Sequence, residues 1–595
     1  QAQIFVLVMQ FPGLQEEAER PQHRKLFRKQ LKYGTAGFRD VADALPMDSV
    51  FFRMGIVAAL RSKAVGASVG VMVTASHNPP ADNGIKIVDF DGGMLAPFVE
   101  PICEEIANAG SEGFHDLVVD IASRMAKQGR TGDGNGQATK FRGSVVLGCD
   151  TRESSARLTR CVERGVEAVG ARVENYGLLT TPQVHHIVRM QNSAELVDLG
   201  MCRVSWASEE GFYQMLLEGL AELVETSSKP VIPPILVDCA GGVGAVQLAK
   251  IQARLQRILR TTVDIVNPAD DPNTLNSNCG AEFVQKGRRA AHGLRHQDVV
   301  TRRLPEENLH ELHLVSFDGD ADRIVFHTWR DDSDWQLLDG DKIAALLGSF
   351  LGKELAAAGI QVGEGGLSYA CVQTAYANGA ATRFLTQEMK VQVAMGKTGV
   401  KYVEHVAKQY DIGVYFEANG HGTVIVQPKA FQAIQDVLSK SPTPEQQRAC
   451  KRLLAFVKVV NQAVGDAISL LLAVEGVLAC MDMAIDDWVR MYKDVPSRQG
   501  KILVPDRLQV KTTEDETQVT EPASLQQEIS RLCAEVDCGR AFIRPSGTEN
   551  AVRVYAEAST TEAANLLAFK VAQTTWKMLG GEAAAEPKGS EYNVE

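Results

Sequence analysis

Residues 144–176 read SVVLGCDTRESSARLTRCVERGVEAVGARVENY, and this stretch decides the fold class. Residues 144–149 form an apolar run of strand length, a helical pattern follows from about 152 to 169, and residues 172–176 are again strand-like. A strand, a helix and a second strand in this order form a βαβ unit, which places both strands parallel in one sheet. The sequence therefore predicts an α/β fold.

The same alternation recurs along the chain. A second unit comprises a strand at residues 235–239, the turn Ala240-Gly241-Gly242, a helix to about 259 and a strand at 263–266. A strand at 312–317 and a return strand at 323–327 follow. After Asp339-Gly340-Asp341, which is a good N-cap, a helix extends to about 358. A third block has strands at 367–372 and 413–416 around a helix at 400–408. The last hundred residues predict a smaller α+β domain, with helices at 524–534 and 561–578 and strands at 541–543 and 551–556.

Composition limits the class of protein. The 595 residues correspond to about four domains. Their net charge of −12 disfavours nucleic acid as a partner, and no apolar run reaches the roughly 18 residues that cross a membrane, so we expect a soluble protein. The apolar residues 4–9 are too short for a signal peptide and are expected to be buried. Eleven cysteines without a CxxC pair indicate reduced thiols and a cytoplasmic location.

Four polar loops near strand ends are candidates for chemistry, and the first is TASHNP at residues 74–79. Ser76 follows a predicted buried strand at 71–74 and has His77 beside it, so it is a candidate nucleophile or phosphate acceptor. Lys86 lies ten residues further on. A simple polar turn before Pro79 is the alternative interpretation.

The second loop, DGDADR at residues 318–323, carries three carboxylates at alternate positions. Asp318, Asp320 and Asp322 can direct their oxygens at one hard cation such as Mg²⁺. A calcium EF-hand fails because Arg323 and Trp329 occupy the positions that need Gly and Glu. A phosphatase with Asp318 as the nucleophile, or a solvated acidic turn, stays open.

The third loop, EANGH at residues 417–421, places Glu417 and Asn419 two positions apart in an extended segment, where both could bind sugar hydroxyls. The fourth, RPSGT at 544–548, combines hydroxyl and backbone N–H donors with Arg544 and the later Arg553, which suits a phosphate. A plain polar turn is the alternative for each loop. Together the four loops supply the parts for phosphoryl transfer on a sugar phosphate.

In this order the loops resemble the α-D-phosphohexomutase superfamily. The chain is most similar to the branch acting on N-acetylglucosamine phosphates, because YGTAGFR at residues 33–39 ends only 35 residues before Thr74 and Asn419 stands where glucose and mannose mutases usually carry Ser. Residues 372–379, 461–468 and 544–556 also resemble that branch. The similarity extends over about 33–558.

The resemblance implies a heart-shaped architecture of three similar α/β domains and a smaller C-terminal α+β domain around one cleft. We expect domain I at residues 1–182, domain II at 183–330 and domain III at 331–455. Linker helices and domain IV follow at 456–580, and a disordered tail at 581–595. The Gly-rich insert at 131–136 is expected to be a loop.

The resemblance also implies roles for site residues. Ser76 would be the phosphoserine and would hold Mg²⁺ together with Asp318, Asp320 and Asp322. The groups around the reacting phosphate would be Arg39, His77, Lys86 and Arg323. Sugar binding would fall to Glu417, Ala418, Asn419 and His421, and binding of the other phosphate to Arg544, Pro545, Ser546, Gly547, Thr548 and Arg553. Lys86 and His77 are both candidates for the general base.

The implied activity is interconversion of N-acetylglucosamine 6-phosphate and 1-phosphate through a sugar 1,6-bisphosphate, supplying UDP-N-acetylglucosamine synthesis. Mg²⁺ and the bisphosphate would be the cofactors and a small sugar phosphate the ligand, with no nucleic acid, membrane or obligate protein partner. A phosphoglucomutase or phosphomannomutase is the alternative within the superfamily. A metal-dependent sugar phosphatase and a non-catalytic sugar-phosphate-binding protein are the alternatives outside it.

Overall fold

The computed structural model describes residues 11–21, 23, 24, 30–34, 37–40, 47–128, 141–227, 232–301, 311–546, 550–580 and 586–594. The chain forms two compact units, residues 1–339 with 419–485 and residues 340–418 with 486–595, and each is considered by itself. The expected buried segment 4–9, the Gly-rich insert 131–136 and the loop residues Gly547 and Thr548 lie outside the described residues.

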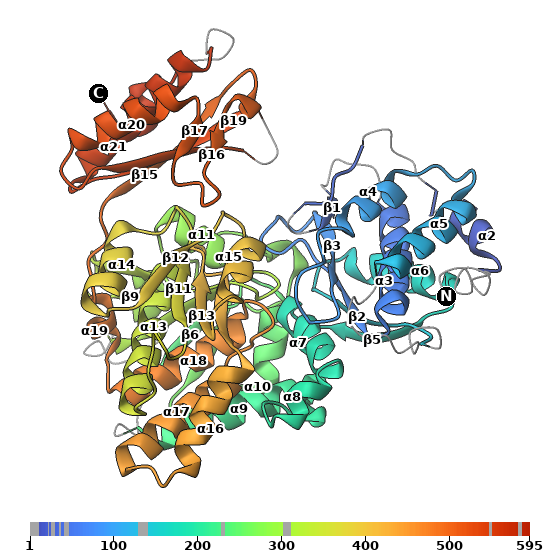
Figure 1. The fold of residues 1–595 in the computed structure, drawn as a ribbon, viewed down its shortest axis with the longest axis horizontal. Helices are drawn as coiled ribbons and strands as arrows, with labels where there is room; N and C mark the ends of the chain where they lie inside the picture. Colours follow the sequence, from blue (N-terminus) through green and yellow to red (C-terminus); the bar gives the residue numbers. More distant parts are fainter. Residues whose placement is uncertain are drawn as a thin grey trace. The chain divides into compact units, whose positions relative to one another are not determined.

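The first unit begins with a five-stranded sheet in the order β1-β3-β2-β4-β5 (Figure 1). The strands are β1 (Phe38–Asp40), β3 (Asn83–Val88), β2 (Val69–Val73), β4 (Ser144–Cys149) and β5 (Arg172–Leu178). The predicted βαβ unit is confirmed, since β4 and β5 are parallel and α6 (Ser155–Ala168) lies between them in the chain. The other helices of this part are α2 (Leu14–Glu19), α3 (Asp48–Val65), α4 (Glu100–Asn108), α5 (Phe114–Lys127) and α7 (Thr181–Gln191).

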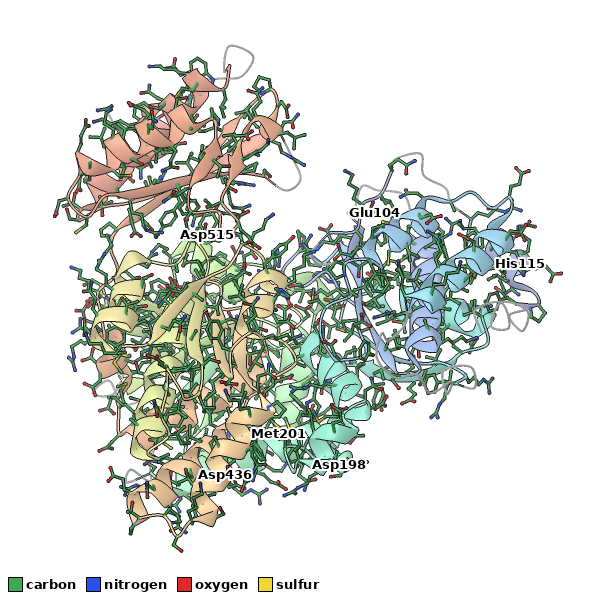
Figure 2. All side chains as sticks on the ribbon, viewed as in Figure 1. Glu104, His115, Asp198, Met201, Asp436 and Asp515 are labelled. Atoms are coloured by element: carbon green, nitrogen blue, oxygen red, sulfur yellow. The ribbon has the colours of Figure 1, made fainter. Side chains whose placement is uncertain are left out.

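Both faces of this sheet are covered. Val71 and Val73 of β2 pack with the core that contains α3 and α6, whereas Met72 packs with Val184 and Ile187 of α7. Alternate residues of a strand point to opposite faces, so helices on both sides bury every position of β2. Figure 2 shows the side chains that fill these layers.

Neither β1 nor β3 of this sheet was predicted from the sequence. β3 runs antiparallel to β2, so residues 74–82 form the tip of a hairpin and Lys86 lies directly opposite Met72. The sequence pattern concealed β3 because Asn83 and Lys86 interrupt its apolar residues. The hairpin brings Lys86 to the same sheet as the strand that precedes Ser76.

The second sheet of this unit has the order β10-β9-β8-β6-β7. Its strands are β10 (Trp335–Leu338), β9 (Ile324–Trp329), β8 (His313–Phe317), β6 (Ile235–Asp238) and β7 (Val263–Val266). The predicted unit at 235–266 is confirmed by the parallel pair β6 and β7, and the predicted return strand by the antiparallel pair β8 and β9. The helices are α8 (Ala194–Asp198), α9 (Glu209–Glu225), α10 (Val243–Leu259), α11 (Ala281–Gly287) and α12 (His296–Val300).

Residues 419–485 complete the first unit with β14 (Gly422–Val426), α16 (Pro428–Ser439), α17 (Pro444–Val459) and α18 (Ala467–Met481). The end of β8, the start of β9 and Gly420 lie together, because the Ile324 N–H donates to the Gly420 carbonyl. Gly420 has φ +84°, and a Cβ there would overlap the Ile324 carbonyl oxygen. Only glycine fits this turn without strain.

The second unit starts with α13 (Gly340–Ala357) and a parallel arrangement of β12 (Gln392–Met395), β11 (Tyr369–Gln373) and β13 (Ile412–Phe416). The helices α14 (Gly379–Arg383) and α15 (Val400–Ala407) flank these strands, and Phe384–Glu388 is a π-helix. α19 (Ile485–Val489) leads into the C-terminal part. The strands and helices predicted for the third block are confirmed.

The C-terminal part is the predicted smaller α+β domain. Its antiparallel sheet has the order β15-β19-β18, formed by β15 (Ser497–Leu503), β19 (Ala551–Glu557) and β18 (Arg540–Pro545). A short pair, β16 (Lys511–Thr512) and β17 (Val519–Glu521), stands beside it. The helices α20 (Ala523–Ala534) and α21 (Thr561–Met578) pack on the sheet through Leu525, Ile529, Leu567 and Val571.

The prediction that residues 581–595 form a disordered tail is wrong for residues 586–594. A 3₁₀ turn at Gly589–Tyr592 lies against this domain, and Tyr592 is only 2% exposed. Its ring occupies the space above Gly500, where a Cβ would come within 2.6 Å of Cε1. The composition of the tail indicated disorder, but Tyr592 and Val594 pack on the core of this domain and Arg498 donates to the Glu591 carbonyl, and these contacts hold the turn in place.

The structure therefore confirms a mixed α/β class with several helix-covered sheets. All eleven cysteines are unpaired, nine of them buried, as the sequence predicts. No helix among the described residues has the length and apolarity required to span a membrane. The boundaries of the four domains expected from the sequence are still predictions.

Candidate active site

Ser76 lies at the tip of the β2–β3 hairpin in a strained backbone conformation, with φ +52°. The residue is only 1% exposed, and its hydroxyl donates to Asp318 Oδ2 at 2.8 Å. His77 Nδ1 is 3.3 Å from the same Oγ. Left-handed φ values are uncommon for serine and cost about 1–3 kcal/mol, so the surrounding structure must hold this conformation.

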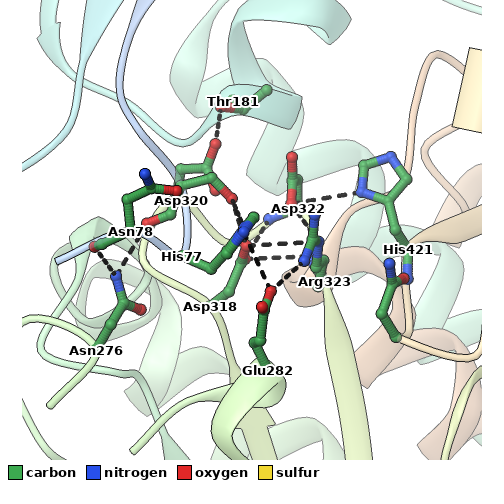
Figure 3. A network of polar contacts seen from close by, with 12 residues as sticks. His77, Asn78, Thr181, Asn276, Glu282, Asp318, Asp320, Asp322, Arg323 and His421 are labelled. Atoms are coloured by element: carbon green, nitrogen blue, oxygen red, sulfur yellow. Dashed lines mark hydrogen bonds and ion pairs between the residues drawn. The ribbon is translucent and has the colours of Figure 1, made fainter. Parts of the chain in front are cut away.

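The predicted metal loop follows β8, and its Asp318 accepts from Ser76. Figure 3 shows the three aspartates of this loop beside His77. Asp318, Asp320 and Asp322 are all buried, and each offers an oxygen within 4.8 Å of the others. The Asp318 Oδ1 accepts from the N–H groups of Asp322 and Arg323 at 3.0 and 3.2 Å, which fixes the curl of the loop. Because the three aspartates occupy alternate positions of this tight turn, their carboxylates lie on one side of it.

Three buried carboxylates repel one another. Burial, followed by the charges of Asp322 and Asp320, raises the pKa of Asp318 well above its usual range. Burial also opposes ionisation of Asp322, but Lys86 and His421 outweigh it and hold the pKa of Asp322 well below its usual range. Protein groups thus compensate the charges of Asp320 and Asp322, whereas Asp318 needs a proton or a cation.

One carboxylate oxygen of this cluster is left for a hard cation to bind. Asp320 Oδ2 accepts from Thr181 Oγ1 at 2.6 Å and from Lys86, but the buried Asp320 Oδ1 has no hydrogen-bond partner among the described residues. Buried carboxylate oxygens normally have a partner. An all-oxygen set of this kind suits Mg²⁺.

Cations border the carboxylates. Lys86 Nζ lies 3.0 Å from Asp320 Oδ2 and 3.3 Å from Asp322 Oδ2. Burial disfavours its charge, but the two carboxylates raise the pKa of Lys86 above its ordinary value, so it is an ammonium ion. Arg39 donates to Asn78 Oδ1 at 2.6 Å, and Arg323 Nε is 3.9 Å from Asp318 Oδ2.

Glu282 of α11 connects two of these groups. Its Oε2 lies 3.2 Å from His77 Nε2 and 2.8 Å from Arg323 Nη1. Burial and the nearby Arg323 lower the pKa of His77 to about 4, so the imidazole is neutral at pH 7. In the neutral tautomer that donates from Nε2 to Glu282, Nδ1 carries no proton and lies 3.3 Å from Ser76 Oγ.

The predicted sugar loop divides between the units. In the first unit, His421 Nδ1 is 3.4 Å from Asp322 Oδ1, and its N–H donates to Asn419 Oδ1 at 2.9 Å. In the second unit, Glu417 Oε1 accepts from the Gly399 N–H at 3.0 Å, and the Ala418 carbonyl accepts from the Gly340 N–H at 3.3 Å. His421 thus belongs with the carboxylates, and Glu417 with the loop before α15.

The predicted phosphate loop lies at the end of β18, in the second unit. Arg544 is directly opposite Arg553 of β19, which in turn is opposite Lys501 of β15, so three cations form a row across the sheet. Pro545 ends β18, and the buried Ser546 donates its N–H to the Ala551 carbonyl at 2.8 Å. Like charges on neighbouring strands are unfavourable unless anions compensate them, and Glu516 Oε2 lies 3.8 Å from Arg544 Nε.

The chain is similar to known proteins over most of its length. Family models match residues 339–483, described as phosphoacetylglucosamine mutase AMG1, domain III, and 203–325, described as domain II of the same family. Models of phosphoglucomutase/phosphomannomutase alpha/beta/alpha domain I and C-terminal domain match 55–113 with 129–199, and 508–574. The human phosphoacetylglucosamine mutase is 41% identical, covering 93% of this chain and 95% of its own.

The chain belongs to the phosphoacetylglucosamine mutase family. The enzyme of that name from Saccharomyces cerevisiae is 40% identical over 89% of this chain and 92% of its own. A solved structure of Aspergillus fumigatus N-acetylphosphoglucosamine mutase, in complex with GlcNAc-6P and magnesium, has a TM-score of 0.83 at 35% identity and covers 95% and 98% of the two chains.

Several residues beside the family loops escaped the sequence analysis. Four of them contact the first two loops from other elements, and these are Arg152, Thr181, Asn276 and Glu282. The fifth, Lys501, lies opposite Arg553 in the C-terminal sheet. Thr181 and Glu282 lie on helices where a polar residue is ordinary, so the sequence offered no signal. Lys501 was detectable only from the register of an antiparallel sheet.

Proposed function

We propose that this chain interconverts N-acetylglucosamine 6-phosphate and N-acetylglucosamine 1-phosphate through phospho-Ser76 and a sugar 1,6-bisphosphate. The observation that carries the proposal is the Ser76 hydroxyl, 2.8 Å from Asp318 and facing the buried carboxylates. The relatives are named for this activity, which supports the proposal. One related structure is described in complex with GlcNAc-6P and magnesium, and another in complex with glucose1,6bisphosphate.

Asp318, Asp320 and Asp322, with a phosphate oxygen on Ser76, are the proposed holders of Mg²⁺. The ion would neutralise charge on the transferred phosphoryl group as a Lewis acid. Lys86, Arg39 and Arg323 are proposed to stabilise the same oxygens as fixed cations. Because Lys86 is protonated, it acts as a cation rather than as a base.

Transfer from phospho-Ser76 breaks the bond between phosphorus and Oγ and forms one to the free sugar hydroxyl. The hydroxyl loses a proton and Ser76 Oγ gains one, so charge and atoms balance. His77 Nδ1, 3.3 Å from Oγ, is proposed to hold the proton at the Ser76 end, oriented by Glu282. The reverse half-reaction uses the same groups in the opposite order.

Glu417, Ala418, Asn419 and His421 are proposed to bind the sugar. The phosphate that does not react is assigned to Arg544, Pro545, Ser546, Gly547, Thr548 and Arg553, with Lys501 in the same row. A site that binds phosphate rather than sugar accepts either end of the bisphosphate. Such a site allows one nucleophile to serve both half-reactions.

Phosphorus NMR tests the activity directly. Purified protein with Mg²⁺ and a trace of glucose 1,6-bisphosphate is given N-acetylglucosamine 6-phosphate and glucose 6-phosphate in parallel. We expect the 1-phosphate to form faster from the N-acetyl sugar, and Ser76→Ala to abolish this. Ser154→Ala, which removes a hydroxyl bonded to Asn83, is the matched control and should turn over normally. Net release of inorganic phosphate would instead favour a phosphatase.

We infer further that the protein acts in the cytoplasm on small molecules and needs no obligate protein partner. The eleven unpaired cysteines support a reducing compartment. We also retain the four domains expected from the sequence as part of this proposal. Cell fractionation tests the compartment. Turnover by the protein purified alone by size-exclusion chromatography tests whether it needs a partner.

A further inference from the structure

A buried arginine that belongs to neither the nucleophile loop nor the metal loop contacts the hairpin that carries Ser76. Arg152 follows β4, and its side chain is fully buried. Its guanidinium donates to four backbone carbonyls of the Ser76 hairpin: Ser76 at 2.8 Å, Asn78 at 3.0 Å, Asp82 at 2.8 Å, and Pro79. An arginine therefore cross-links the whole tip of the hairpin.

The other end of this arrangement is Asp150. Its Oδ2 accepts from Arg152 Nε at 2.9 Å and from Thr74 Oγ1 at 2.7 Å. Thr74 Oγ1 in turn accepts from the Ser76 N–H at 2.9 Å. The N–H of Ser76 is thus tied to Asp150 through Thr74, while its carbonyl is tied to Arg152. Both sides of the strained residue are anchored to one buried ion pair.

A second donor reaches the hairpin from the other sheet of the unit. Asn276 Nδ2 donates to the Ser76 and Asn78 carbonyls, each at 3.0 Å, the same two that Arg152 Nη2 contacts. Figure 3 shows Asn276 and Asn78 beside the carboxylates. The Asn276 N–H donates to the Ala240 carbonyl at 2.8 Å, so Asn276 is itself fixed to the turn after β6.

We propose that Arg152, assisted by Asn276, is the positioning residue that holds Ser76 in its left-handed conformation and so aims Oγ for phosphoryl transfer. This inference rests on the proposed function of Ser76. A guanidinium presents its donors in a rigid plane, whereas an ammonium group has three donors at one point and cannot reach four separated carbonyls. The conservative change Arg152→Lys therefore keeps the charge and loses the geometry.

The test compares kcat and KM of Arg152→Lys with those of Arg61→Lys. Arg61 is the matched control because it forms a bidentate pair with Asp89 that is also nearly buried, with Nε and Nη2 each donating at 3.0 Å. Asp89 directly follows β3, at the opposite end of the hairpin from Ser76. We expect kcat of Arg152→Lys to fall about 100-fold with KM changed by less than about threefold, because misplacement of a reacting group acts on the chemical step. Arg61→Lys should keep kcat within about threefold while losing similar thermal stability.

A milder pair of variants covers the case in which Arg152→Lys does not fold. Asn276→Ala should lower kcat about 10-fold. Its control is Asn192→Ala, which removes an amide that also donates to two carbonyls. These are the carbonyls of Ser68 and Phe90, which lie at the open end of the β2–β3 hairpin, opposite the tip that carries Ser76. Asn192→Ala should leave kcat unchanged.

The outcomes separate this inference from the proposed function. If the wild-type protein shows no mutase turnover, the proposed function fails first. If the wild type is active and Arg152→Lys, or Asn276→Ala where the former does not fold, lowers kcat no more than its control, the positioning role is refuted and the proposed function stands. A selective loss of kcat, with slower transfer of labelled phosphate from glucose 1,6-bisphosphate to Ser76, supports it.

Discussion

Replacement of Lys86 by methionine should make the stability of the first unit depend strongly on a divalent cation. Methionine has similar length and no charge, so Lys86→Met removes the ammonium that lies 3.0 Å from Asp320 and 3.3 Å from Asp322 and leaves the packing of β3 in place. The lysine side chain is 10% exposed and the two carboxylates 0% and 7%, so water cannot replace the lost partner.

The magnitude follows from these distances. At an effective dielectric constant near 20, unit charges at 3.0 and 3.3 Å attract by roughly 5 kcal/mol each. The desolvation of the ammonium offsets much of this, and loss of one partner of a buried ion pair costs about 3–5 kcal/mol. A bound Mg²⁺ would restore positive charge to the same carboxylates and recover most of that loss.

Thermal unfolding of the wild type and Lys86→Met, each with excess chelator and with saturating Mg²⁺, measures the effect. We expect the variant to unfold about 5–15 °C lower in chelator and to be stabilised by Mg²⁺ more than the wild type is. Lys63→Met is the control, because Lys63 donates to the Val169 carbonyl and faces no carboxylate cluster in the described structure. Its smaller loss should not depend on Mg²⁺.

Two results would refute this reasoning. One is a Lys86→Met variant with the same unfolding temperature as the wild type in chelator. The other is a loss of equal size with and without Mg²⁺, which would mean that the ammonium contributes packing rather than charge.

Three further predictions concern the free energy of unfolding. Gly420→Ala should lower it by more than about 3 kcal/mol because the new Cβ would overlap the Ile324 carbonyl. Gly170→Ala, also at positive φ but in open space, should lower it by about 1 kcal/mol, and equal losses in urea titrations would contradict this. Burial lowers the pKa of His327 to about 3, so the unfolded chain gains a proton below pH 6.5 that the folded chain does not. Stability from this group is therefore present above pH 6.5 and lost as pH falls toward 3, roughly 5 kcal/mol in all, and His327→Gln should flatten the measured pH profile. Tyr592→Ala should destabilise the C-terminal domain by about 3 kcal/mol, seen as faster hydrogen exchange in β15 and α21; unchanged exchange would mean that the C-terminal turn does not stabilise it.

Elements whose character is local were predictable from sequence. β4, β7 and α21 occupy the predicted residues, because an apolar run or a helical period of sufficient length is itself the cause of burial. β3 was not predictable in this way. Its Lys86 would be costly inside an isolated sheet, and it is accommodated only by Asp320 and Asp322, more than 230 positions away in the chain.

The same distinction holds for the site. Ser76, the three aspartates and the arginines of the last loop were recognisable because each loop carries its chemistry in a few consecutive residues. Glu282, Asn276 and Arg152 were not, since each acts through contacts with residues that are distant in sequence.

By itself the sequence therefore determined the α/β class, the order of the loops and the identity of the groups that could react. Only the tertiary structure decided which groups are compensated, which stay neutral and which hold Ser76 in place. The physical reason is that residue identity sets the kind of chemistry, whereas charge state and backbone strain depend on burial and on neighbours within a few ångströms, which are brought together only by folding.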